Sequence, residues 1–515
     1  MALARTLTTV LVVALTAAGL VFGFGARAAL ADEPGVPAGF RVVSKEPVAP
    51  GVERLTLERE KPPLRVNVAR IAPDAAVSLR AVLSNDVVAG PDPIVERTSS
   101  MCQRTHCLLA VNGDFAGGDD EPLGGLLTGG ELLRTPNPSQ LQLSVGKDGS
   151  LSAGELSWSG TLVPTDLAPL TLAGVNVAAS QDGITLYTAA YGPTLETPGP
   201  TTVVGFRNIE PTGRLVVGQT TMVEIIGLWE QLAGSAPSPV PADGGVLVGR
   251  GPAADVLRSL WSRAQTGAVS SRALLRLDAQ AGVAESLGGS PILIRNGARW
   301  FADAANDFTR GRQPRTLVGW NPVGERLLVT VDGRQPDTSV GMTLVEAADL
   351  LLALGATDGI NLDGGGSTTF VAGGAVVNTP SDVAVRRGDG EAIHHLASPG
   401  QQVIGHVERP VTSALVVVPK NEVSVTPAPA MTGAASGNQA LLVPARSSTD
   451  PGSVPGGGVP ALVPGPEAGV GGALRLAAVM ADVIVTVALA VLAVRRRRLA
   501  AGRGHLRTDN TAMAA

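Results

Sequence analysis

Cysteine, histidine, aromatic residues and charge are all scarce in this 515-residue chain. It has 2 cysteines, 5 histidines, 3% aromatic residues and 17% charged residues. The few histidines argue against a histidine-rich metallophosphatase site. The net charge of −5 provides no overall basic field that would attract nucleic acid. The sequence therefore predicts no nucleic-acid partner.

Glycine and proline are abundant instead, with 64 and 38 residues. Together they exceed their usual combined share of about 12%, so turns or linkers must take up the excess. Residues 419–472 repeat Pro, Gly, Ala and Ser and cannot bury a core, which predicts a flexible stalk. The folded part is then expected within residues 32–418.

Both ends of the chain predict export. Residues 1–31 are apolar and finish in Ala29-Leu30-Ala31, which indicates a cleaved signal peptide or, alternatively, an uncleaved signal anchor. Residues 473–494 are apolar and long enough for a helix across a hydrocarbon core of about 30 Å. The basic residues 495–515 would stay in the cytoplasm. We therefore expect a single-pass plasma-membrane protein with an extracellular domain.

One acidic residue, Asp482, lies inside the predicted span. It is either a contact to a partner helix or a tolerated acid, because the surrounding Leu, Val, Ile and Ala residues can outweigh its cost of about 2.5 to 3.5 kcal/mol.

The two cysteines, Cys102 and Cys107, lie five positions apart. In an exported protein such a pair predicts a disulfide. The alternative is a metal site with His106, but two thiols and one imidazole without a second pair are a weak zinc pattern.

Strand-like patterns dominate residues 32–418, and helical ones are fewer. Residues 52–58, 64–71 and 77–83 predict strands, and residues 124–133 predict a hairpin around Gly129-Gly130. Residues 343–354 predict a helix that begins with a Thr343–Glu346 capping box. We expect an α+β (mixed α/β) fold, in which a mixed β-sheet with packed helices and a β-rich N-terminal part forms a single extracellular domain followed by one transmembrane helix.

Strands are predicted on both sides of that helix, over residues 326–331 and 359–362. This spacing is typical of a right-handed crossover between parallel neighbours. Asp332 and Asp363 follow the two strands, so both carboxylates are expected at the carboxyl edge of the sheet, where open α/β sheets bind ligands.

A glycine-rich segment, Gly364-Gly365-Gly366, directly follows Asp363. Its backbone N–H groups and the hydroxyls of Ser367, Thr368 and Thr369 suit an anion or a sugar. The segment lacks the lysine and spacing of a Walker loop and the x-Gly that follows a nucleophile-elbow serine. A plain tight turn with a β-bulge would explain two glycines but not the whole run.

The segment 359–369 resembles the signature of the phosphodiester glycosidase family. Other segments fit the family in the same order, so the resemblance spans roughly residues 45–415: 48–52, 110–115, 186–188, 289–291, 314–319 and 378–382. Ala116 and the segment Arg386-Arg387-Gly388 depart from the family's usual residues, which puts details of the substrate pocket in doubt.

The resemblance implies hydrolysis of a sugar-1-phosphodiester, N-acetylglucosamine-like, at the C1–O bond to free sugar and phosphomonoester. Such a site must neutralise the departing phosphate and supply a carboxylate for the oxocarbenium-like centre or for the attacking water. We assign the first task to Arg315 and the second to Asp363 and Asp332. Residues with an expected substrate-binding role are Asn112, Asp114, Thr316, Gly364, Gly365, Gly366, Ser367, Thr368, Thr369 and Asp382.

Several of these residues also allow simpler interpretations. Arg315 could form a surface ion pair, and Asp332 could belong to a hairpin turn with Gly333. Asp114 could be a turn acid after Asn112-Gly113, and Asp382 could cap a helix or a turn.

Two other functions stay open. One is a non-catalytic surface protein that binds cell-wall glycan. The other is a metal-dependent phosphodiesterase in which Asp114, Asp332 and Asp363 hold Ca²⁺ or Mg²⁺; the glycosidase itself would require no cofactor. The joint presence of Arg315, Asp363 and the glycine run favours the glycosidase. Its substrate would be a cell-envelope or extracellular phosphoglycan.

Overall fold

The computed structural model describes residues 35–89, 94–117, 120–197, 199–302, 306–387, 390–394 and 402–420, which all belong to one compact unit. The predicted signal peptide (1–31), the stalk from residue 421 on, the span (473–494) and the tail (495–515) lie outside these ranges. Within them, no helix combines the length and apolar character needed to cross a membrane.

The largest sheet has eight strands, paired antiparallel throughout. Helix α5 (Leu344–Ala353) packs on it and buries Leu344, Ala347 and Leu351 in a shared core with Val329. In spatial order the strands are β1 (Arg41–Ala49), β2 (Val52–Arg59), β3 (Leu64–Ile71), β23 (Arg326–Val331), β22 (Arg315–Trp320), β24 (Asp358–Asn361), β20 (Ile292–Arg295) and β21 (Ala298–Arg299).

Two five-stranded sheets share a second core with this sheet. Val318, Ile360, Phe370 and Leu415 meet in that core, and each comes from or borders a different strand. One sheet contains β26 (Ala375–Val376), β25 (Phe370–Ala372), β5 (Leu109–Asn112), β30 (Ser413–Pro419) and β4 (Val77–Leu83); the other contains β7 (Glu131–Arg134), β6 (Leu126–Thr128), β19 (Val283–Gly288), β8 (Gln142–Gly146) and β9 (Leu151–Gly154).

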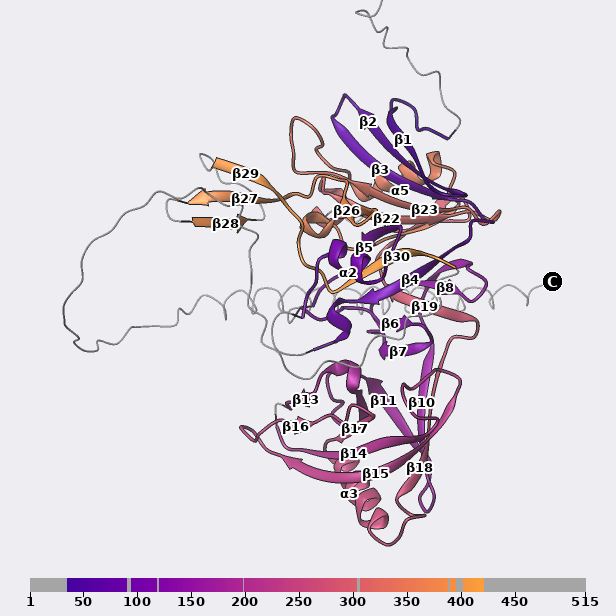
Figure 1. Cartoon of the computed structure of the whole chain (residues 1–515), viewed down its shortest axis with the longest axis vertical. Helices are drawn as coiled ribbons and strands as arrows, with labels where there is room; N and C mark the ends of the chain where they lie inside the picture. The colour runs from indigo at the N-terminus through magenta and orange to yellow at the C-terminus, as the bar shows by residue number, and fades with distance from the viewer. Residues whose placement is uncertain are drawn as a thin grey trace, which may run out of the picture. The chain divides into compact units, whose positions relative to one another are not determined.

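A closed seven-stranded barrel is inserted between β9 and β19 (Figure 1). Helix α3 (Pro252–Ala264) contacts barrel strands and buries Leu257 and Leu260 in a core with Phe206 and Leu247. The strands in barrel order are β10 (Trp158–Pro164), β11 (Leu170–Val175), β12 (Ile184–Thr188), β17 (Gly244–Gly249), β14 (Thr201–Glu210), β15 (Thr220–Gln231) and β18 (Arg272–Ala279).

Short elements complete the described part of the chain. They are η1 (Ser84–Asp86), α2 (Thr98–Arg104), η2 (Ala189–Tyr191), β13 (Thr194–Leu195), β16 (Ser238–Pro239), α4 (Asp307–Arg310), η3 (Gly365–Ser367), β27 (Asp382–Arg387), β28 (Gly390–His394) and β29 (Gln402–Val407).

The expected α+β (mixed α/β) fold class is wrong, because the described chain is mainly β. Its longest helix, α3, has 13 residues, and the others are shorter. The crossover prediction needs a related correction. Strands β23 and β24 run in the same direction, but β22 lies between them and pairs antiparallel with both. Strand β22 precedes β23 closely in sequence and forms a hairpin with it, which leaves its other edge for β24.

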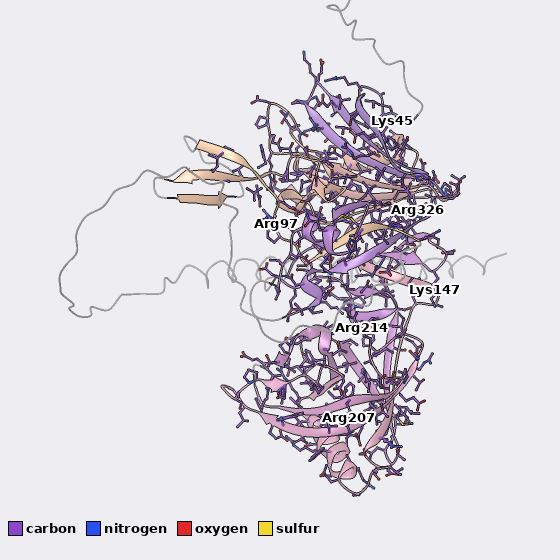
Figure 2. The ribbon with its side chains drawn as sticks, viewed as in Figure 1. Lys45, Arg97, Lys147, Arg207, Arg214 and Arg326 are labelled. Atoms are coloured by element: carbon purple, nitrogen blue, oxygen red, sulfur yellow. A yellow bond between two sulfur atoms is a disulfide. The ribbon has the colours of Figure 1, made fainter. Side chains whose placement is uncertain are left out.

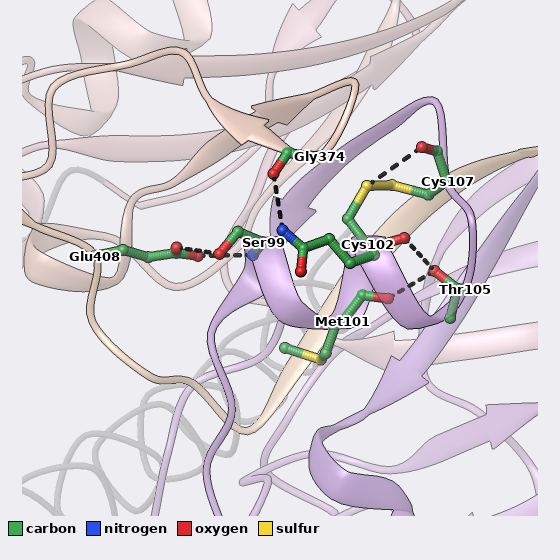
Figure 3. Close-up of a disulfide and its surroundings, with 8 residues drawn as sticks. Ser99, Met101, Cys102, Thr105, Cys107, Gly374 and Glu408 are labelled. Atoms are coloured by element: carbon green, nitrogen blue, oxygen red, sulfur yellow. Dashed lines mark hydrogen bonds between the residues drawn. A yellow bond between two sulfur atoms is a disulfide. The ribbon is translucent and has the colours of Figure 1, made fainter. Parts of the chain in front are cut away.

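The predicted disulfide between Cys102 and Cys107 is confirmed, with their Cα atoms 4.9 Å apart (Figure 3). It fastens the end of α2 to the chain that enters β5 and therefore leaves no thiols for a metal site with His106. At the other end of α2, the backbone N–H and hydroxyl of Ser99 donate to the carboxylate of Glu408.

Several exposed basic side chains pair with nearby acidic residues. Of the residues labelled in Figure 2, Lys45 pairs with Glu53, Arg207 with Glu224 and Arg214 with Glu131. Ion pairs on the surface of a protein contribute little stability. The arginines near the candidate site, described next, differ from these because they are buried or half-buried.

Candidate functional site

The glycine-rich turn that follows β24 is the centre of the candidate site. Its 3₁₀ turn, η3, begins at Gly365, whose φ of 62° lies in the left-handed region that favours glycine. At Gly366 a Cβ atom would collide with the guanidinium of Arg409 and the carboxylate of Asp382. Glycine is thus required by conformation at one position and by close approach at the next.

Asn112, at the end of β5, joins this turn to two sheets. Its Nδ2 donates to the backbone oxygen of Asp363 at 2.7 Å, and its Oδ1 accepts from Thr316 Oγ1 at 2.6 Å and from Thr369 N at 3.1 Å. The side chain is fully buried. The structure therefore gives Asn112 and Thr316 the task of positioning the turn.

Asp363 is the candidate carboxylate that stays partly accessible to solvent. Its Oδ1 accepts from Gly364 N at 2.9 Å, and its side chain also bonds to Ser367. Burial raises its pKa, while the bonds from Ser367 and Gly364 and the charge of Arg409 act in the opposite direction. A partly exposed carboxylate fixed by its own turn can act on a bound molecule.

Asp332 lies at the predicted edge, after β23, but both of its oxygens are occupied. Oδ1 accepts from Asn378 Nδ2 at 3.0 Å and Oδ2 from Thr379 N at 3.1 Å. The residue is 1% exposed, and burial raises its pKa to about 6. These contacts indicate that Asp332 holds the segment after β26 beside the turn.

Asp114 is buried two residues after β5. Its Oδ1 accepts from Phe115 N at 2.7 Å and its Oδ2 from Gly124 N at 2.6 Å, so it closes a loop. Burial raises its pKa to about 7, although both backbone bonds lower it, and the charge of Asp363 adds to the rise. Asp114 and Asp363 are therefore close enough to interact electrostatically.

Arg315, the predicted phosphate clamp, is 2% exposed at the start of β22. Its Nε donates to Met342 O at 3.0 Å, and its Nη2 donates to Phe308 O at 2.7 Å and Gly311 O at 3.0 Å. Burial and the nearby charge of Arg334 lower its pKa to about 10. Arg315 is not in a surface ion pair; it fastens α4 to the sheet.

Two other arginines, Arg334 and Arg409, flank the turn and were not predicted. A Cβ on Gly365 would lie 3.1 Å from Arg334 Nη2, and Gly366 abuts Arg409. Arg409 also binds Asp382 with two bonds, from Nε to Oδ2 at 2.8 Å and from Nη2 to Oδ1 at 2.9 Å. The charge of Arg409 lowers the pKa of Arg334, in addition to the larger effect of burial. Two half-buried guanidinium groups thus lie beside the turn.

Neither arginine stands in the motifs used above. Arg334 nevertheless follows Asp332-Gly333 directly. A search for cations just beyond each predicted strand end would have found Arg334. Nothing comparable marks Arg409, which lies against Gly366 and pairs with Asp382.

Residues 230–418 match the family model described as phosphodiester glycosidase. The predicted resemblance to that family is confirmed. The chain is 34% identical over 119 residues to the N-acetylglucosamine-1-phosphodiester alpha-N-acetylglucosaminidase of Bos taurus and 32% identical over 119 residues to that of Homo sapiens. Each match covers 21% of this chain, and 22% or 23% of the relative, so the chain matches only about a fifth of the length of these relatives.

A solved structure of a hypothetical protein from Synechocystis has a similar fold. The TM-score is 0.53 at 20% sequence identity, and the superposition covers 73% of this chain and 63% of the other. The phosphodiester glycosidase match contains the turn, Arg315, Arg334, Asp363, Asp382 and Arg409. Asn112 and Asp114 precede it in sequence and reach the same site through β5.

The three hydroxyl residues predicted to contact the substrate, Ser367, Thr368 and Thr369, are all buried. The hydroxyls of Thr368 and Thr369 have no hydrogen-bond partner among the described residues. The three carboxylates proposed as metal ligands, Asp114, Asp332 and Asp363, do not form a group that could hold an ion; nor does any other set of three such residues within the described ranges.

Proposed function

We propose that this protein is a glycosidase that hydrolyses a sugar-1-phosphodiester at the C1–O bond and releases free sugar and a phosphomonoester. The observation that carries the proposal is the partly exposed residue Asp363 on a glycine turn flanked by Arg334 and Arg409. The family match over residues 230–418 supports it.

The two guanidinium groups suit the phosphate. A departing phosphate carries negative charge, and planar guanidinium groups neutralise it through paired N–H donors. Arg334 donates from Nε to the neutral amide of Gln313 at 2.9 Å, and no direct ion pair neutralises it among the described residues. Arg409 is oriented by Asp382. The phosphate is therefore bound by Arg334 and Arg409, while Arg315 acts as a positioning residue.

Asp363 supplies the carboxylate at the sugar carbon. Because phosphate is a good leaving group, strong acid assistance is needed less than for an ordinary glycoside, and a carboxylate that stabilises the oxocarbenium-like centre or activates water is sufficient. Burial raises the pKa of Asp363, which makes its carboxylate a stronger base than one in water. Asp332 does not share this role, because both of its oxygens accept bonds from the segment at Asn378–Thr379.

Product analysis tests the proposal. The protein is incubated with an N-acetylglucosamine-1-phosphodiester, with and without chelator. Free sugar with chelator present supports the glycosidase, sugar phosphate would indicate a phosphodiesterase, and no product would leave only glycan binding. Asp363→Asn should abolish turnover. The matched control is Asp349→Asn, which removes an exposed acid of α5 paired with Arg299 and should be fully active.

The location outside the plasma membrane stays a prediction from the sequence of the two ends. It favours an extracellular phosphoglycan as substrate. Protease added to intact cells should degrade the folded part if the prediction is right, and should leave it intact if the protein is inside.

A further inference from the structure

Two phenylalanines lie together beside the candidate site of this aromatic-poor chain. The ring centroids of Phe115 and Phe308 are 6.2 Å apart, and the rings are tilted by 59°. Phe308 is 44% exposed and Phe115 is half-buried. The pair therefore presents aromatic surface to solvent. Exposed ring surface does not contribute the stability that a ring buried in the core provides.

The backbone of each phenylalanine is held by a buried ionisable residue. Arg315 donates to the backbone oxygen of Phe308 at 2.7 Å, and its guanidinium carbon lies 5.6 Å from the centroid of that ring. Asp114 accepts from the backbone N–H of Phe115 at 2.7 Å. Burying a polar side chain is unfavourable unless it is hydrogen-bonded, and here both buried side chains make hydrogen bonds that fix the backbone of a residue with an exposed or half-buried ring.

Hydrogen bonds connect the segments that carry the rings to the turn. Asp363 N donates to Gly113 O at 3.0 Å, two residues before Phe115, and Gly365 N donates to Pro314 O at 2.9 Å, next to Arg315. Arg334 Nε donates to Gln313 Oε1 at 2.9 Å in the same segment as Arg315. The aromatic pair thus lies on chain segments that adjoin Asp363 on one side and Arg334 on the other. A molecule bound at the turn would extend across the rings.

We propose that Phe115 and Phe308 form a platform that binds the sugar ring of the substrate. A pyranose has an apolar face of C–H groups, and an N-acetyl group adds a methyl; both pack well on aromatic rings. With the phosphate between Arg334 and Arg409, the platform would select an N-acetylhexosamine over a charged or smaller group. This inference rests on the proposed function and adds to it the residues that contact the sugar.

Sugar binding and turnover, measured separately, test the platform. Binding of N-acetylglucosamine to the full chain is measured by saturation-transfer NMR, and kcat and KM are measured on the diester. Phe308→Ala should weaken sugar binding about tenfold or more and raise KM, with a smaller change in kcat. Phe308→Tyr should bind within about twofold of the wild type. Trp300→Ala is the matched control, because Trp300 is 57% exposed beside Arg295 and should change nothing.

The outcomes separate the platform from the reaction. Sugar binding that depends on Phe308 without any cleavage by the wild type would support the platform and contradict the proposed function. Cleavage by the wild type together with unchanged binding and KM in Phe308→Ala would overturn the platform and leave the reaction standing. A wild type that fails to bind the sugar overturns the platform as well.

Discussion

At the scale of single residues, side chains of the same type have different roles, which depend on the hydrogen bonds that their polar atoms make. Asp332 and Asp114 have both oxygens bonded within the protein, whereas Asp363 is partly open. Arg315 donates hydrogen bonds to three backbone carbonyl oxygens, whereas Arg334 donates to one neutral amide. Position at the sheet edge therefore does not by itself make a residue catalytic.

The first prediction concerns the phosphate. Arg334→Ala should lower kcat/KM about 100-fold or more, because loss of one preorganised group that stabilises transition-state charge costs about 2.7 to 4 kcal/mol. Arg207→Ala is the control, since Arg207 is an exposed partner of Glu224. Steady-state kinetics on the diester decide the matter. An Arg334→Ala enzyme with wild-type kcat/KM would show that the phosphate binds elsewhere.

A second prediction follows from the raised pKa of Asp114. The folded protein keeps a proton on Asp114 up to about pH 7, whereas the unfolded chain releases it near pH 3.9. Unfolding between about pH 3.9 and 7 therefore releases a proton from Asp114. The stability that protonated Asp114 contributes is fully present below about pH 3.9 and is lost as the pH rises to about 7. Within this pH range the unfolding free energy should change by about −1.4 kcal/mol per pH unit.

Urea unfolding at several pH values measures this slope. The unfolding free energy of the wild type minus that of Asp114→Asn should fall between pH 4 and 7. A second comparison uses Asp332→Asn. Here the difference in unfolding free energy should stop falling nearer pH 6, because the pKa of Asp332 is raised to about 6. Differences that stay flat with pH in both comparisons would show that neither carboxyl is protonated in the fold.

At the scale of elements, local signals were sufficient for several strands and for helix α5. The capping box of Thr343 and Glu346 is present as predicted, and residues 64–71, 77–83 and 326–331 are strands with the predicted bounds. The position of β22 between β23 and β24 was missed, because pairing of strands far apart in sequence leaves no local pattern. The same reason hid Arg409, which reaches Gly366 from 43 positions away, and the barrel as a whole.

The turn at η3 gives the third prediction. In Gly366→Ala the new methyl would collide with the Arg409–Asp382 pair, so the pair must move or the turn must open. Such overpacking typically costs about 1 to 3 kcal/mol of stability, and kcat/KM should fall at least tenfold because Arg409 is displaced. Gly154→Ala is the control, because a Cβ there meets nothing within 4 Å. Wild-type kinetics in Gly366→Ala would mean that the pair is not needed for turnover.

At the scale of the whole molecule, the barrel is an insertion that leaves and re-enters the rest of the fold at one point. Trp158 and Ala279 are paired across β10 and β18, and Gln280 N donates to Ser157 O at 2.9 Å just beyond them. None of the residues proposed for the reaction lies in residues 158–279. The barrel therefore contributes none of the residues proposed for the reaction.

The last prediction is that the reaction survives removal of the barrel. Replacing residues 158–279 by Asn-Gly would close a two-residue hairpin in which the existing bond from Gln280 to Ser157 becomes the turn's own hydrogen bond. Leu127 and Leu132, which now pack against the barrel core, would lose their cover at roughly 1.5 to 3 kcal/mol each. The shortened protein should thus melt at a lower temperature but keep kcat/KM within about threefold. If calorimetry shows a folded protein and kinetics show no turnover, the barrel contributes to the site directly.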